Sequence, residues 1–223
     1  MDDKKKNPKN FFVKAYSKGE EIFNAVSHGV GAVLAVSALT VMVVLSAQQH
    51  DPYKIASSIV YGISMLVLYV MSTLYHAIPF PRVKRIFQIF DHCSIFLLIA
   101  GTYTPFSLVT LHPWPGWLIF GVIWGSAILG IILNAVDLKR FKRFSLVLYI
   151  AMGLAIILAF GPLTRTMERP GIVWLLVGGA FYLVGVVFYT NKKVKFMHSI
   201  WHLFVLAGSI CHYLSILLYI ICA

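Results

Sequence analysis

Residues 24–46, NAVSHGVGAVLAVSALTVMVVLS, contain no Lys, Arg, Asp or Glu, and a helix of this length crosses a bilayer. The stretch is too long for the apolar region of a typical secretory signal peptide, so we predict a retained membrane span. Because backbone groups inside lipid must be hydrogen-bonded within the segment itself, the span is predicted to be a helix. This stretch therefore indicates an integral membrane protein.

The composition of the whole chain agrees with this class. Hydrophobic residues make up 59% of the 223 residues, charged residues make up 12%, and the mean hydropathy is +0.82. A soluble domain carries about 25% charged residues, so this chain has too little polar surface to cover a water-exposed globule. The three cysteines, Cys93, Cys211 and Cys222, form no CxxC pair and are predicted to be small buried hydrophobic residues.

Apolar runs fill most of the remaining chain, separated by short loops with turn or charge signals. We predict an all-α bundle of seven transmembrane helices, over residues 24–46, 55–78, 87–111, 117–136, 144–163, 171–190 and 199–222. Residues 1–19 are predicted to form a basic tail, and residues 20–223 the single transmembrane domain.

The distribution of positive charge orients this bundle. Sixteen of the 19 Lys and Arg residues fall in the amino-terminal tail or in the loops after the second, fourth and sixth spans. Lys54, Arg165 and Arg169 fall on the other side. The positive-inside rule then predicts a cytoplasmic amino terminus and an external carboxyl terminus in the cell membrane. We attribute the net charge of +11 to this orientation and to contact with anionic lipids, and expect no nucleic-acid partner.

Ionisable side chains within the spans are few, and each costs about 2.5–3.5 kcal/mol or more at the bilayer centre. In the predicted orientation most of them lie at one depth, near the cytoplasmic face. His76 ends the second span, Asp91 begins the third, and His198 and His202 begin the seventh. Such a convergence indicates a functional site.

The spacing of the histidines indicates a metal site. His198 and His202 are four residues apart on one face of a helix, where two imidazoles can bind one ion. His76 would complete three ligands and leave a fourth position open for water, which is the ligand set of catalytic zinc. Asp91 at the same depth suits a general base or a partner of a ligand, and Ser72, one turn before His76, could orient water or polarise a substrate carbonyl.

Structural roles for these residues are also open. Asp91 could pair with a nearby Arg or with a neighbouring His, and Ser72 could only join helices by a hydrogen bond. Ser17 and Glu20 have the spacing of a capping box at a helix start.

Three further histidines are set apart from the predicted metal site. His28 is interpreted as part of a polar network, and His92 is expected to face away from Asp91. His212 lies ten residues beyond His202 and is excluded. Gly101 and Pro105 are interpreted as packing and kink features.

Five short motifs, in order along the chain, resemble those of the bacterial hemolysin III proteins, which belong with the progestin and adipoQ (adiponectin) receptors. The motifs are Glu20…Asn24…Ser27-His28-Gly29, Ser72-Thr73-Leu74-Tyr75-His76, Asp91-His92, Gly101-Thr102-Tyr103-Thr104-Pro105 and His198-x-x-x-His202. The resemblance covers the chain from about residue 20 onward and implies a seven-helix bundle with a zinc ion near the cytoplasmic face. The implied ligands match His76, His198 and His202, with Asp91 and Ser72 close by. One departure is Ser199, which stands where the family leads us to expect an acidic residue.

Two functions follow as hypotheses. The first is a zinc-dependent, ceramidase-like hydrolase of a lipid amide or ester, involved in membrane lipid homeostasis, with membrane lipids as its partners. The alternative is a pore-forming or cytolytic membrane protein, or a channel, without hydrolase activity. The oligomeric state is left open by the sequence.

Overall fold

The computed structural model describes residues 16–191 and 193–223, and within these residues every regular element is a helix. The elements are α1 (Lys18–Gln48), α2 (Pro52–Ala77), α3 (Pro81–Pro105), η1 (Phe106–Thr110), α4 (Gly116–Leu154), η2 (Ala155–Ala159), α5 (Phe160–Thr166), α6 (Arg169–Thr190), α7 (Met197–Ile216) and η3 (Leu217–Ile221). In the part of the chain described, six helical stretches are long and apolar enough to cross a membrane. The predicted all-α membrane class is confirmed.

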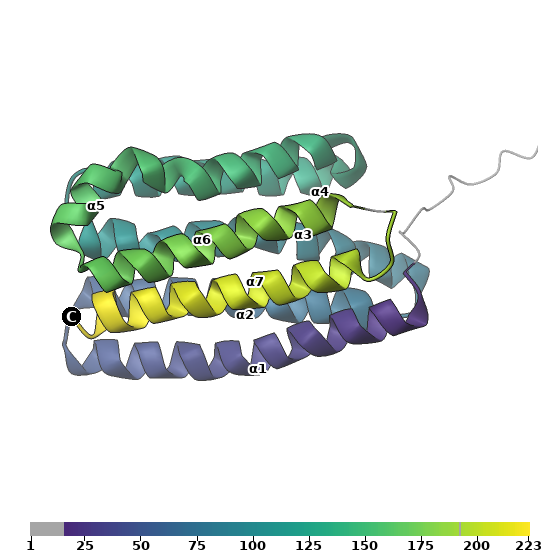
Figure 1. Cartoon of the computed structure of the whole chain (residues 1–223), viewed down its shortest axis with the longest axis horizontal. Coiled ribbons are helices and arrows are strands. Elements are labelled where there is room, and N and C mark those ends of the chain that lie inside the picture. Colours follow the sequence, from purple (N-terminus) through teal and green to yellow (C-terminus); the bar gives the residue numbers. More distant parts are fainter. Residues whose placement is uncertain (1–15, 192) are drawn as a thin grey trace, which may run out of the picture.

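One of these six stretches contains two of the predicted spans. Residues 116–166 form a stretch of 51 residues, which as a straight helix would be about 76 Å long against a bilayer core of about 30 Å. The backbone of Asp137 is not helical, with φ −156° and ψ 88°, and its carboxylate accepts the amide N–H groups of Lys139 and Arg140. Figure 1 shows that α4 turns back on itself, so that it forms a helical hairpin. The sequence predicts a loop within the same stretch, between the fourth and fifth spans.

Side chains cap the amino-terminal ends of the first two helices by accepting hydrogen bonds from backbone N–H groups. Ser17 and Glu20 form the predicted capping box, so α1 starts at Lys18, before the apolar run itself begins. Asp51 caps α2 by accepting the amide N–H groups of Tyr53 and Lys54. Of the predicted basic tail, residues 1–15 lie outside the described residues. In Figure 1 the start of α1 and the carboxyl terminus lie at opposite ends of the bundle.

The first helix turns mostly small and polar residues inward and large apolar residues outward. On α1 the buried residues recur every three or four positions: Glu20, Asn24, His28, Gly31, Ala35, Ala38, Met42 and Ser46. The opposite face exposes Ile22, Val26, Val30 and Val33. This arrangement suits a helix with lipid on one side and neighbouring helices on the other.

Of the cysteines, Cys211 is buried, Cys93 is partly buried and Cys222 is exposed. The prediction was wrong for Cys222, because this residue follows the last helical turn.

A close contact between α2 and α3 holds the two helices that carry His76 and Asp91. A Cβ atom added at Gly101 would lie 2.6 Å from the Cβ of Ser64, so only glycine fits there. Pro105 ends α3 and is followed by the π-helical turn η1, as expected of a proline that interrupts regular hydrogen bonding. Gly101 has the packing role that the sequence indicated.

The Gly101 contact predicts the effect of a single methyl group. Gly101→Ala should lower the stability of the purified protein by about 1–3 kcal/mol, because Ser64 must move to admit the methyl group. The measurement is thermal unfolding in detergent. Gly125→Ala on α4 is the matched control, since an added Cβ there meets nothing within 4 Å. If the Gly101 and Gly125 variants unfold at the same temperature, the α2–α3 contact is not as tight as described.

Candidate metal centre

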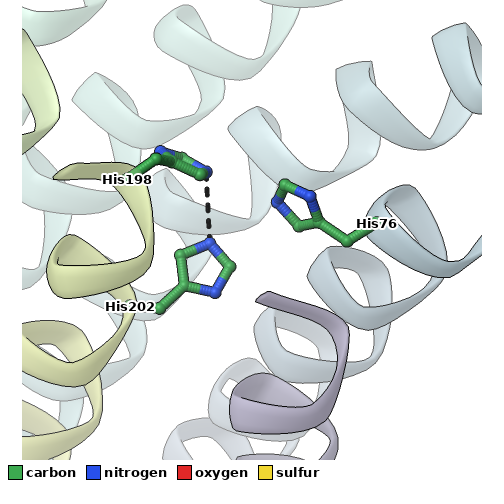
Figure 2. Close-up of side chains that lie close together, drawn as sticks. All are labelled: His76, His198 and His202. Carbon is green, nitrogen blue, oxygen red and sulfur yellow. Dashed lines mark hydrogen bonds between the residues drawn. The ribbon is translucent and has the colours of Figure 1, made fainter. Parts of the chain in front are cut away.

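Three histidines from two helices meet at the end of the bundle where α1 begins. Figure 2 shows His198 and His202 on the first two turns of α7, facing His76 on the last turn of α2. One nitrogen of each ring lies within 4.8 Å of the other two, an arrangement that could hold a metal ion. His76 and His202 are buried, with 3% and 2% of their surface exposed. The predicted ligand residues are therefore brought together.

The nitrogen atoms of the cluster fit a metal ligand set. Nε2 of His198 and Nε2 of His202 are 3.2 Å apart, close to the separation of about 3.3 Å that tetrahedral geometry gives for zinc–nitrogen distances of about 2.0–2.1 Å. Nε2 of His76 is buried and has no hydrogen-bond partner among the described residues. A buried nitrogen without a partner is costly, and a metal ion between the rings would satisfy it.

The carboxylate of Glu21 binds the ring nitrogen of His76 that faces away from the other two histidines. Nδ1 of His76 lies 2.7 Å from Oε2 of Glu21, whose other carboxylate oxygen accepts from Nζ of Lys84 at 3.0 Å. Lys84 also donates to the carbonyl of Tyr75 at the end of α2. A histidine bonded to a carboxylate through one nitrogen presents its other nitrogen in a fixed direction, which is the common arrangement behind metal ligands. Glu21 thus turns Nε2 of His76 toward the other two rings.

Glu21 was not among the predicted site residues, although the sequence contains a signal for it. Glu21, Asn24 and His28 recur at spacings of three and four residues, so they share one face of α1. The neighbouring Glu20 has a different role. It closes the capping box, and its Oε1 accepts the backbone N–H of Phe196 at 2.9 Å, which ties the start of α7 to the start of α1.

A second bond joins α1 to α7 at this depth. The hydroxyl of Ser199 donates to Oδ1 of Asn24 at 2.6 Å, and both residues are buried. Ser199 is the position where the family resemblance suggested an acidic residue. Here the short hydroxyl fills a place between the helices, beside the histidine cluster.

His28 was expected to take part in a polar network. Its ring stacks on that of His202, with centroids 3.6 Å apart and an interplanar angle of 17°, and meets the edge of Tyr69. Both of its nitrogens are buried without a hydrogen-bond partner in the described chain. The contacts of His28 are therefore ring contacts with His202 and Tyr69.

A cavity of about 320 Å³ begins at the histidine cluster and extends between α3, α4, α6 and α7. Its polar end is formed by Ser72, Asp91, His198 and His202, and most of its remaining wall is apolar. The structure thus places both predicted catalytic residues on the cavity that contains two of the predicted ligands.

The contacts of Asp91 and Ser72 bear on the structural roles that the sequence left open for them. Oδ2 of Asp91 lies 3.4 Å from Nδ1 of the adjacent His92, so one structural alternative, a contact with a neighbouring His, does occur. His92 was expected to face away from Asp91, yet it lines the same cavity. The Ser72 hydroxyl on α2 is buried beside Asp91 on α3, so the other structural alternative, a contact that joins two helices, stays open for it.

The cavity is open at its side. Among its lining residues, Leu154 on α4 and Leu183 on α6 are 39% and 41% exposed on the outer surface of the bundle. A Cβ added at Gly153 or at Gly179, which also line the cavity, would meet nothing within 4 Å. The opening therefore lies between α4 and α6, whose outer surfaces carry exposed Leu, Ile and Val side chains that suit contact with lipid.

Comparisons with known proteins agree with the motifs. The family model described as haemolysin-III related matches residues 16–213. Hemolysin-3 of Bacillus cereus is 44% identical over 202 residues, covering 91% of this chain and 92% of that protein, and the Hemolysin-3 homolog of Bacillus subtilis is 40% identical over 200 residues, covering 90% and 94%. The human monocyte to macrophage differentiation factor is 28% identical over 208 residues, covering 90% and 84%. This chain, a multi-pass membrane protein, therefore belongs to the haemolysin-III related family.

Proposed function

We propose that this protein is a zinc-dependent hydrolase that cleaves an amide or ester bond of a membrane lipid and so takes part in membrane lipid homeostasis. One observation carries the proposal: three histidines form a cluster, and two of them, with an aspartate and a serine, line the polar end of an apolar cavity that opens toward lipid. Metal ligands, a base and a hydroxyl are the groups that hydrolysis requires, and the apolar wall suits a lipid chain.

Seven crossings with a cytoplasmic amino terminus are part of this proposal. The break at Asp137 divides a stretch too long for one crossing, and the start of α1 and the carboxyl terminus lie at opposite ends of the bundle. The basic loops support the orientation. The histidine cluster then faces the cytoplasmic leaflet.

Zinc is the proposed ion, held by His76, His198 and His202. Three neutral imidazoles with one position left open are typical of catalytic zinc. An ion in this position would activate water as a nucleophile and polarise the carbonyl of the lipid. Glu21 keeps His76 oriented, and Lys84 in turn holds Glu21.

The protein side chains have separate roles in the hydrolysis. The carboxylate of Asp91 accepts the proton that the attacking water loses, while the water oxygen forms a bond to the carbonyl carbon. The Ser72 hydroxyl donates a hydrogen bond to the negative charge that develops on the carbonyl oxygen. Asp91 then returns the proton to the leaving nitrogen or oxygen as its bond to carbon breaks. The products are a carboxylic acid and an amine or alcohol.

The alternative, a lytic protein or a channel, fits the cavity less well. A conducting path needs polar groups along its length, whereas the wall of this cavity is mostly apolar, with Leu as its most frequent residue. Conductance of liposomes containing the purified protein, unchanged when the three histidines are replaced, would favour the alternative.

The metal site predicts a stoichiometry. Purified wild-type protein should contain about one zinc ion per chain, and His198→Ala/His202→Ala should contain almost none, because two of three ligands are lost. Elemental analysis measures this directly. His112→Ala, an exposed histidine at the other end of the bundle, should retain the metal. Equal metal contents in the wild type and the double variant would exclude the site.

Because Glu21 orients His76, its replacement should weaken zinc binding although all three histidine ligands remain. Glu21→Gln should raise the dissociation constant for zinc about 10–100-fold, because His76 loses the carboxylate that orients it. Competition with a chelator of known affinity provides the measurement. Glu168→Gln, at the start of α6 and remote from the cluster, is the control and should bind zinc like the wild type. An unchanged affinity in Glu21→Gln would show that the pair does not support the ligand.

If Asp91 is the general base, a variant without its carboxylate should bind zinc but should not hydrolyse the lipid. Asp91→Asn should lower hydrolysis of long-chain ceramides or lipid esters at least about 100-fold, because the amide cannot accept the proton, while zinc content stays unchanged. The assay measures released fatty acid. Asp51→Asn is the control, since asparagine also caps helices and this residue lies at the opposite end of α2. Turnover at the wild-type rate in Asp91→Asn would remove the general base from the mechanism.

A further inference from the structure

Tyr103 on α3 lines the cavity, and its hydroxyl group contacts the backbone of the second half of the α4 hairpin. The side chain is buried, and the hydroxyl donates to the carbonyl oxygen of Met152 at 2.8 Å, with a longer contact of 3.2 Å to the carbonyl of Gly153. The same hydroxyl accepts the backbone N–H of Ile156 at 2.8 Å. One side-chain oxygen thus binds both a carbonyl and an N–H group of a single helical stretch.

These two backbone groups would bond to each other in a regular α-helix, because the N–H of each residue donates to the carbonyl four residues earlier. The Tyr103 hydroxyl takes the place of that bond between Ile156 and Met152. The N–H of Ala155 donates to the carbonyl of Met152, only three residues earlier, and residues Ala155–Ala159 form the 3₁₀ helix η2. The change of helix type therefore begins where Tyr103 enters the backbone ladder.

The stretch that Tyr103 interrupts forms one rim of the side opening of the cavity. Gly153, Leu154 and Ile157 line the cavity and are also exposed on the outer surface. The opposite rim comes from α6, where the residues that line the cavity and are exposed recur every three or four positions: Leu176, Ala180 and Leu183. The Tyr103 hydroxyl thus acts on the backbone of one edge of the opening.

The type of helix decides where the side chain of Leu158 points. In a regular α-helix, Leu158 would lie only about 40° around the axis from Leu154, on nearly the same face. At about 120° per residue, the turn of a 3₁₀ helix places it about 120° away. Leu158 is 90% exposed and is not among the residues that line the cavity, whereas Leu154 lines it. A return to α-helical geometry would turn Leu158 toward the opening.

We propose that the Tyr103 hydroxyl keeps the side opening wide enough for a lipid chain to pass, by holding the backbone ladder open and Leu158 on the outer surface. The proposal rests on the proposed function, because it takes a membrane lipid to be what enters. Tyr103 is a positioning residue. A lipid crosses the opening both on entry and on exit, so a narrower opening slows both steps by the same factor and leaves the affinity unchanged.

The rates of lipid binding test this role. Purified protein in detergent is mixed with 11-dansylundecanoic acid in a stopped-flow instrument, and binding is followed by energy transfer from the protein tryptophans to the dansyl group. Excess stearate then displaces the probe and gives the dissociation rate. Tyr103→Phe keeps the ring and loses only the hydroxyl. We expect both rate constants to fall about tenfold in this variant, with an unchanged dissociation constant.

Two substitutions at position 158 test the geometry. In Tyr103→Phe/Leu158→Ala the smaller side chain should restore both rates, because Leu158 is the group that narrows the opening. Leu158→Trp in a chain that retains Tyr103 should bind the probe at wild-type rates, since this position faces outward there. The Trp variant keeps the hydroxyl, so it tests the geometry even if Tyr103→Phe does not fold.

Tyr149→Phe is the matched control. The Tyr149 hydroxyl also joins α4 to α3, by donating to the carbonyl of His92 at 2.6 Å, but it is not inserted between two backbone groups of α4. This variant should bind the probe at wild-type rates.

Four outcomes would overturn the role of Tyr103 and leave the proposed function in place. They are unchanged rates or a weaker affinity in Tyr103→Phe, slow binding that persists in the double variant, slow binding in Leu158→Trp, and equal slowing in Tyr149→Phe. If the wild type does not bind the probe at all, the lipid cavity and the proposed function fail together.

Discussion

Lipid offers no hydrogen bonds, so a polar side chain within the bundle must find its partner in the protein, on its own helix or on another, or remain unsatisfied at a cost of a few kcal/mol. In this protein the constraint acts most strongly at the end of the bundle where α1 begins. Glu21 on α1 bonds to His76 on α2 and to Lys84 on α3, and Asn24 on α1 bonds to Ser199 on α7. Four helices are joined there by polar contacts.

The histidine cluster is a consequence of those contacts. His76 faces α7 because Glu21 holds its other nitrogen, and the first turn of α7 is held near α1 through Glu20 and Ser199. The three rings therefore meet because contacts to α1 hold His76 on one side and the start of α7 on the other, and a metal ion would join them directly. This explains why a buried nitrogen of His76 has no partner within the described protein.

The cavity shows the same division between polar and apolar groups. Its polar residues gather at the cluster, and the rest of its wall is apolar and open at the side between α4 and α6. A lipid with a reactive head and a long chain has the matching distribution of chemistry.

The sequence by itself determined the membrane class, the helical class, the family and the three histidines, because these depend on the length of apolar runs and on spacing within single helices. It also indicated the capping box at Ser17, the packing role of Gly101 and the chain reversal near Asp137, since each is a local signal. Only the tertiary structure decided that Glu21, rather than Glu20, supports His76, and that His28 makes ring contacts without hydrogen bonds. It alone brought His212 to the cavity of the cluster. These outcomes depend on how neighbouring helices are rotated against one another, and periodicity within one helix does not specify that rotation.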